Sequence, residues 1–135
     1  MLRRVFVSGI GIISSIGKNL PETVGSLLEA RSGIGRLIHL KSRHSNDFPF
    51  AEVPLSTVEL GKLAGITDFT TYSRNTLLGI IAAKEAFGQA KRQTDEQDSW
   101  KTGLISATTV GGMDICEQYY RDFLTNDSKN RFIDL

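Results

Sequence analysis

Three closely spaced glycines near the start of the chain are the first candidates for chemistry. Gly9, Gly11 and Gly17 follow a short apolar run, and such glycines can cradle phosphate groups at the start of a helix. The dinucleotide motif requires G-x-G-x-x-G, but position 14 is Ser14, and no acidic residue clearly closes a second strand about 20 residues further on. The chain also lacks a G-x-x-x-x-G-K-[ST] phosphate loop. We therefore interpret the glycines as a tight turn after a strand, and nucleotide binding is a poor hypothesis.

The side chains able to bind a metal do not have the spacing of a metal site. Cys116, His39 and His44 lack the ligand spacing of a zinc centre, so we expect no metal. The acidic cluster at positions 95–98 lies among basic residues in a polar stretch, which is typical of a solvated loop. A single cysteine forms no internal disulfide, which favours a reducing, intracellular compartment.

Bulk composition describes an ordinary globular domain. A chain of 135 residues has room for one domain, with 40% hydrophobic and 23% charged residues. A net charge of +1 argues against a dedicated nucleic-acid surface. No apolar stretch approaches the ~18 residues that cross a bilayer, and the run from Val5 to Ile16 is too glycine-rich for a membrane helix. We therefore expect a cytoplasmic protein without a membrane span.

The first half of the chain predicts a strand followed by helices. The β-branched run after Arg4 predicts a buried strand that ends in the glycine turn. A helix is expected to start at Asn19 or Leu20, where Pro21 suits the first turn, and to stop at Gly33. Residues 34–66 are less regular, with short extended pieces at 37–40 and 50–53 and a short helix within 56–64.

The strongest periodic element runs roughly from Thr71 to Lys91. Apolar residues surround most of its circumference, which predicts burial on more than one face, in the middle of a larger layered body. Small residues on this helix permit close approach of a neighbouring element: Gly79, Ala82, Ala83 and Ala86.

A second strand and helix complete the pattern. Residues 102–110 predict a buried strand that ends at Gly111-Gly112, and helical spacing resumes from Met113 to Phe123. Strands alternating with helices indicate the α/β class.

The residue pattern of these segments resembles the N-terminus of a β-ketoacyl-[acyl-carrier-protein] synthase, a ketosynthase of the thiolase superfamily. The matching stretches occur in family order: R-R-V-x-V-S-G-I-G from Arg3, I-S-S-I-G from Ile13, L-L-E-A-R-S-G-I from Leu27, and the strand and Gly-Gly turn at 102–113. Two departures are Ser15, where proline is frequent, and Thr108-Thr109, where smaller residues are common.

The resemblance implies a fold and an activity for a longer protein. It implies that residues 1–135 form a single partial domain, the incomplete N-terminal half of a thiolase-like layered fold. Complete enzymes of this family condense acyl and malonyl thioesters with decarboxylation, in fatty-acid or polyketide synthesis, with acyl carrier protein as partner and without a cofactor. A homo-oligomer is also implied. The family's nucleophilic cysteine and paired histidines would lie beyond this segment, so we expect no catalytic residue here and no activity of the chain alone.

The resemblance also bears on individual residues. The family's cysteine lies in a small-residue elbow at a helix N-terminus, whereas Cys116 lies a turn inside an expected helix, so we predict a semi-buried structural cysteine. His39 and His44 are expected at the surface. The apolar residue before the Gly-Gly pair lines the family's acyl pocket near the dimer interface, which makes Val110 the substrate-binding candidate; a buried strand residue is the alternative interpretation.

A second hypothesis belongs to another class of protein. The chain can instead be a non-catalytic α/β interaction module that binds a partner subunit through its apolar helix and an exposed edge.

Overall fold

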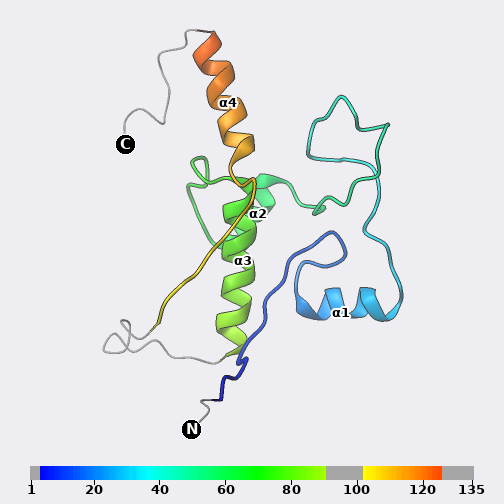
Figure 1. The fold of residues 1–135 in the computed structure, drawn as a ribbon, viewed down its shortest axis with the longest axis vertical. Helices are drawn as coiled ribbons and strands as arrows, with labels where there is room; N and C mark the ends of the chain where they lie inside the picture. Colours follow the sequence, from blue (N-terminus) through cyan, green and yellow to red (C-terminus); the bar gives the residue numbers. More distant parts are fainter. Residues whose placement is uncertain (1–3, 91–101, 126–135) are drawn as a thin grey trace.

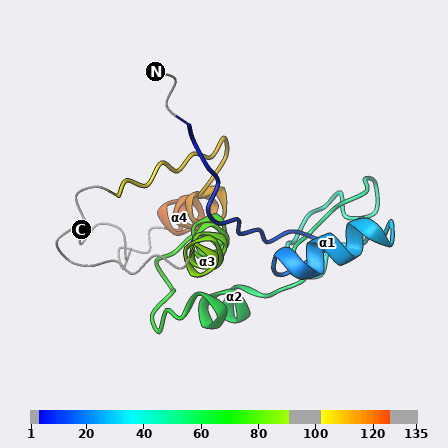
Figure 2. The same cartoon turned by 90° about the horizontal axis from the view of Figure 1, so that it is seen from below.

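The described part of the chain is helical. The computed structural model describes residues 4–90 and 102–125. Four helices follow one another in these ranges: α1 (Leu20–Leu28), α2 (Thr57–Ala64), α3 (Arg74–Gln89) and α4 (Met113–Leu124). The long α3 is the central element, and α4 extends away beyond its beginning (Figure 1). Figure 2 shows α2 beside α3, with α1 set apart from the pair.

The helix starts follow from local capping chemistry. The side-chain oxygen of Asn19 accepts a hydrogen bond from the Glu22 N–H at 2.9 Å, and Ser56 forms a capping box with Glu59. Ser73 caps α3 by accepting from the Thr76 N–H. The predicted starts of the first two helices are thereby confirmed, whereas α3 begins at Arg74, three residues after the predicted start at Thr71.

The predicted end of the first helix is wrong. The helix stops at Leu28 rather than near Gly33, because Ala30 adopts a left-handed φ of 52° and Arg31 N–H closes the turn onto the Ser26 carbonyl at 2.8 Å.

The core lies between α2 and α3. Leu60 and Leu77 are fully buried against each other's helices, and the remaining buried apolar residues of the cluster are Leu55, Ala64 and Ile81. The Lys84 ammonium of α3 donates to the Ala64 carbonyl at the end of α2, where orphan carbonyls and the helix dipole favour a cation. Apolar packing and this polar contact together join the two helices.

The N-terminal segment lies along α3 and runs in the opposite direction. Gly9 and Gly11 pass so close to the backbone carbonyls of Ala86 and Ala82 that any Cβ would collide with them. The N–H groups of Ile10 and Ile12 bond to side chains of α3, which are described next. The small residues on this helix therefore permit close approach, as predicted.

The side chains of Glu85 and Gln89 accept backbone hydrogen bonds that a neighbouring β-strand would otherwise accept. Gln89 Oε1 accepts from Ile10 N–H at 2.6 Å, and Glu85 Oε2 accepts from Ile12 N–H at 2.9 Å. The second carboxylate oxygen of Glu85 accepts from Leu20 N–H at 2.7 Å, at the start of α1. One carboxylate thus joins α3, the glycine segment and α1.

The prediction of two buried strands is wrong for the described residues. Val5 is 93% exposed and Ile105 is 98% exposed, and their apolar neighbours Phe6, Val7 and Leu104 are also largely exposed. Within residues 4–90 and 102–125 the backbone forms no strand ladder, only isolated bridges between Ser14 and Gly17 and between Gly35 and Phe50. These segments have no neighbouring strand to cover them in the described part, so the α/β class is not confirmed.

The segment between α1 and α2 is held by a carboxylate rather than by strands. Residues 37–40 do not form the expected extended piece. Instead, the Glu52 carboxylate accepts from the N–H groups of Ile38, His39 and Leu40, at 2.6 to 3.2 Å. The expected loop at 91–99 lies outside the described residues. None of the helices in the described part is long and apolar enough to cross a membrane.

Removing the Glu85 carboxylate should loosen three elements at once. We expect Glu85→Ala to lower the free energy of unfolding by about 2 kcal/mol, because two N–H groups lose a charged acceptor. Urea unfolding followed by circular dichroism measures the change. Glu117→Ala is the matched control, because Glu117 pairs only with the exposed Arg121 on the same helix. Equal losses in the two variants would contradict this role of Glu85.

The Glu52 contacts predict a pH dependence of stability. Partial burial raises the pKa of Glu52, but the three backbone hydrogen bonds and the nearby His39 outweigh it, so the net pKa is lowered. A lowered folded-state pKa means that the stabilisation is complete above the unfolded-state pKa and is lost as pH falls through the folded-state pKa. Glu52→Gln should remove this acid-side loss, measured by urea unfolding between neutral and acidic pH. A variant with the unchanged pH profile would refute the assignment.

Candidate functional site: a neutral hollow beside α3

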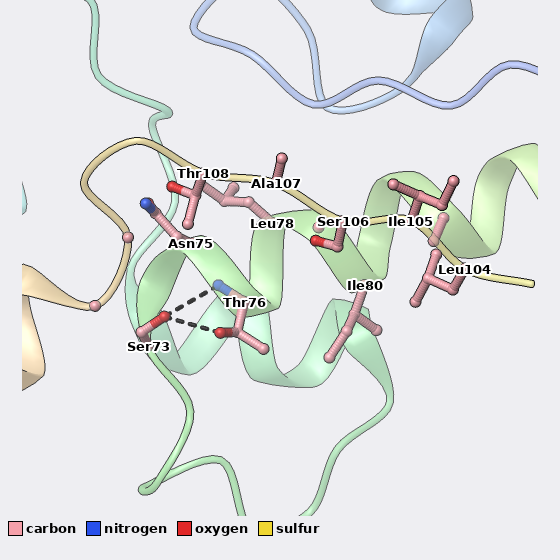
Figure 3. A pocket seen from close by; sticks show the side chains of 14 residues that line it. Ser73, Asn75, Thr76, Leu78, Ile80, Leu104, Ile105, Ser106, Ala107 and Thr108 are labelled. Carbon is pink, nitrogen blue, oxygen red and sulfur yellow. Dashed lines mark hydrogen bonds between the residues drawn. The ribbon is translucent and has the colours of Figure 1, made fainter.

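A hollow of about 780 Å³ lies between α3 and the chain segment that leads into α4. Its walls come from two stretches that are distant in sequence (Figure 3). From α3 and its cap come Ser73, Asn75, Thr76, Leu78, Gly79, Ile80 and Ala83, and from the other stretch come residues 104–108, Gly111 and Gly112. Small side chains on α3 leave the space open, since a Cβ on Gly79 would meet nothing within 4 Å.

The hollow has a polar end and an apolar end. Ser73, Asn75 and Thr108 lie toward one end, and Leu104 and Ile105 lie toward the other (Figure 3). This ordering arises because residues 104–108 run opposite to α3, so that Thr108 lies near the start of the helix. A ligand with a polar head and an apolar tail matches this arrangement.

Free hydrogen-bonding groups are concentrated at the polar end. The Ser73 hydroxyl is already engaged, because it accepts from Thr76 N–H at 3.2 Å and lies 2.9 Å from the Thr76 hydroxyl. The side-chain amide of Asn75 has no hydrogen-bond partner among the described residues and remains available to a ligand.

Among the described residues, the lining contains no titratable side chain. Its polar side chains are hydroxyls and one amide, so the hollow suits an uncharged ligand, and none of the described lining residues is an acid or base that could activate these hydroxyls as nucleophiles. In the described ranges no three histidine, cysteine or acidic side chains come together as a metal site. The arrangement therefore supports binding rather than acid–base chemistry.

Val110 lies beside the hollow in the chain. It follows Thr108 and precedes Gly111, both of which line the hollow, but Val110 itself is 64% exposed and is not part of the lining. The alternative interpretation of Val110 as a buried strand residue is wrong for the described structure. Its role in substrate binding stays a prediction.

Cys116 is not the semi-buried residue that the sequence predicted. It lies inside α4 as expected, but its thiol is exposed, because no residue of α4 is buried against the rest of the described chain. His44 is at the surface and pairs with Asp47 at 2.9 Å, which confirms its prediction, whereas His39 is half-buried. The two histidines lie between α1 and α2 while Cys116 lies on α4, so they form no common site (Figure 1).

The sequence pattern did not identify Asn75 and Ser106 as lining residues. Asn75 is a polar residue near the start of a mostly apolar helix, which was the one available signal. Ser106 carried no signal, because the expected strand accounted for it.

Sequence comparisons identify the class of protein to which the chain is similar. Fourteen curated relatives match convincingly, and they include 3-oxoacyl-[acyl-carrier-protein] synthases and nodulation proteins E. The resemblance to β-ketoacyl-[acyl-carrier-protein] synthases is thereby confirmed. No family model and no solved structure matches the chain.

Particular relatives cover nearly the whole chain. Nodulation protein E of Rhizobium sp. (strain N33) is 29% identical over 132 residues, which are 96% of this chain and 31% of the relative. The 3-oxoacyl-[acyl-carrier-protein] synthase 1 of Escherichia coli (strain K12) is 39% identical over 59 residues, 44% of this chain and 14% of the relative. The chain thus spans less than a third of the length of these relatives.

Proposed function

We propose that the chain is the N-terminal portion of a β-ketoacyl-[acyl-carrier-protein] synthase of fatty-acid or polyketide synthesis, working in the cytoplasm as a homo-oligomer. The observation that supports this proposal is the match to 3-oxoacyl-[acyl-carrier-protein] synthases, two of which align with 82% and 85% of the chain. The names of these relatives include the acyl carrier protein, which is the proposed partner.

The complete enzyme would perform a decarboxylating condensation. An acyl group passes from the carrier protein to a cysteine thiolate, and a malonyl thioester then loses carbon dioxide. The resulting enolate attacks the acyl carbonyl and releases the thiolate, while hydrogen-bond donors stabilise the developing negative charge. Cys116 is exposed, and neither His39 nor His44 lies beside it, so we assign none of these steps to this segment.

The contribution of this segment is a wall of the acyl-binding region. The uncharged lining of the hollow suits an acyl chain at the Leu104 and Ile105 end, and Asn75 supplies a hydrogen bond to a polar head at the other. Val110 adjoins the hollow and contacts the acyl chain in this proposal.

The isolated chain should catalyse no condensation. An assay with acyl-carrier-protein thioesters and malonyl thioester, followed by release of carbon dioxide, should give the uncatalysed rate for both the unchanged chain and Cys116→Ala. Condensation that disappears in Cys116→Ala would overturn the assignment of this cysteine. Reading the gene downstream of Leu135 tests the larger claim, because an open frame should encode a cysteine elbow and two histidines.

Filling the hollow should weaken acyl binding. Gly79 and Gly88 both lie on α3 with open space at their Cβ positions, but only Gly79 lines the hollow. Gly79→Phe should weaken binding of a long-chain acyl-pantetheine by about ten-fold, because the ring occupies the space for the acyl tail. Isothermal titration measures the affinity, with Gly88→Phe as the matched control. Equal affinities for the two variants would exclude the hollow as the acyl site.

The interaction-module hypothesis is favoured by one separate observation, the exposure of apolar residues on both extended segments. Val5, Phe6 and Val7 are 93%, 79% and 80% exposed, and large exposed apolar patches promote association. We expect the isolated chain to self-associate, and Val7→Lys to reduce the associated mass in light scattering. A clean monomer at high concentration would contradict this expectation.

A further inference from the structure

Among the described residues, the helix α4 packs little against the other helices. None of its residues is buried, and only α2 and α3 pack extensively against one another among the described helices. The chain enters α4 through Gly111 and Gly112, and Gly112 has a left-handed φ of 84°. Gly112 also occupies the N-cap position, so α4 has no side-chain cap of its own.

One carboxylate makes the recorded polar contact between α4 and α3. Asp114, in the first turn of α4, accepts a hydrogen bond from the Arg74 N–H at 3.0 Å, across 40 residues of sequence. Arg74 is the first residue of α3, so the same carboxylate lies at the N-termini of two helices. Each N-terminus carries a partial positive charge that a carboxylate stabilises.

The side chain of Arg74 fixes the start of α3. The residue is only 8% exposed, and its guanidinium donates to the Val53 carbonyl at 2.7 Å, so its position is fixed from the α2 side. The Asp114 carboxylate therefore bonds to a helix start that is itself held in place.

We propose that Asp114 is a joint that fixes α4 to α3, and that Gly111–Gly112 is the pivot about which α4 turns when the joint opens. Both glycines line the hollow, so the pivot lies in the wall of the hollow. A side chain at Gly111 would collide with Thr108, which keeps the pivot compact next to that end. The inference concerns only the described helices and does not depend on the proposed enzymatic function.

The single cysteine of the chain allows a direct test. Cys116 is exposed on α4, so a nitroxide attached to it reports the motion of this helix by electron paramagnetic resonance. Asp114→Ala should increase the mobile fraction of the spectrum and speed hydrogen exchange of the α4 amides by about five-fold, the size expected for one lost hydrogen bond between the helices. Asp122→Ala, in the last turn of the same helix, removes an equal charge; because a carboxylate there opposes the helix dipole, this variant should leave both readouts unchanged or slightly lower.

The variant Asp114→Asn distinguishes the contribution of the hydrogen bond to Arg74 N–H from that of the negative charge of the carboxylate. Its amide oxygen still accepts from Arg74 N–H but no longer carries a charge, so we expect an intermediate mobility and exchange rate. If circular dichroism shows that Asp114→Ala loses helix content, Asp114→Asn is compared with Asp122→Ala instead, provided that both variants retain their helix content. Mobility and exchange in the Asp114 variants that match those of Asp122→Ala would overturn the proposal.

Discussion

The close contact between the glycine segment and α3 is the constraint on which the described structure depends. Gly9 and Gly11 bring their backbone against the carbonyls of α3, and this approach leaves N–H groups that must find acceptors. Glu85 and Gln89, one helical turn apart, provide them. Because Glu85 also holds the start of α1, the position of α1 depends on the same carboxylate.

On another side of α3 the neighbouring segment does not pack closely against the helix, and this produces the hollow. There the helix again presents small residues, Gly79 and Ala83, but no glycine of the neighbouring stretch closes onto them. The side chains of Leu104 and Ile105 stand off the helix, and space remains between them. The same feature of α3, a surface of small residues, thus gives contact in one place and a binding volume in another.

Helix positions followed from local sequence, because caps act within one turn. Asn19, Ser56 and Ser73 each accept from an N–H group three residues away; the first two starts were predicted, and the start of α3 was predicted three residues too early. The resemblance to ketosynthases could also be recognised from the sequence, because it depends on the order of residue types and not on tertiary contacts. The end of α1 was not predictable from Gly33, because Ala30 adopts the left-handed conformation usually left to glycine.

The amino-acid sequence by itself determined the four helices, the small residues on α3 that permit close approach, and the similarity to part of a condensing enzyme. Only the tertiary structure decided the exposure of Val5 and Ile105, the neutral lining of the hollow and the exposed position of Cys116. The reason is that a run of β-branched residues favours an extended backbone, whereas the burial of its side chains depends on a neighbouring strand or layer. Contacts such as Glu85 with Ile12, and Asp114 with Arg74, join residues far apart in sequence, and no local pattern records them.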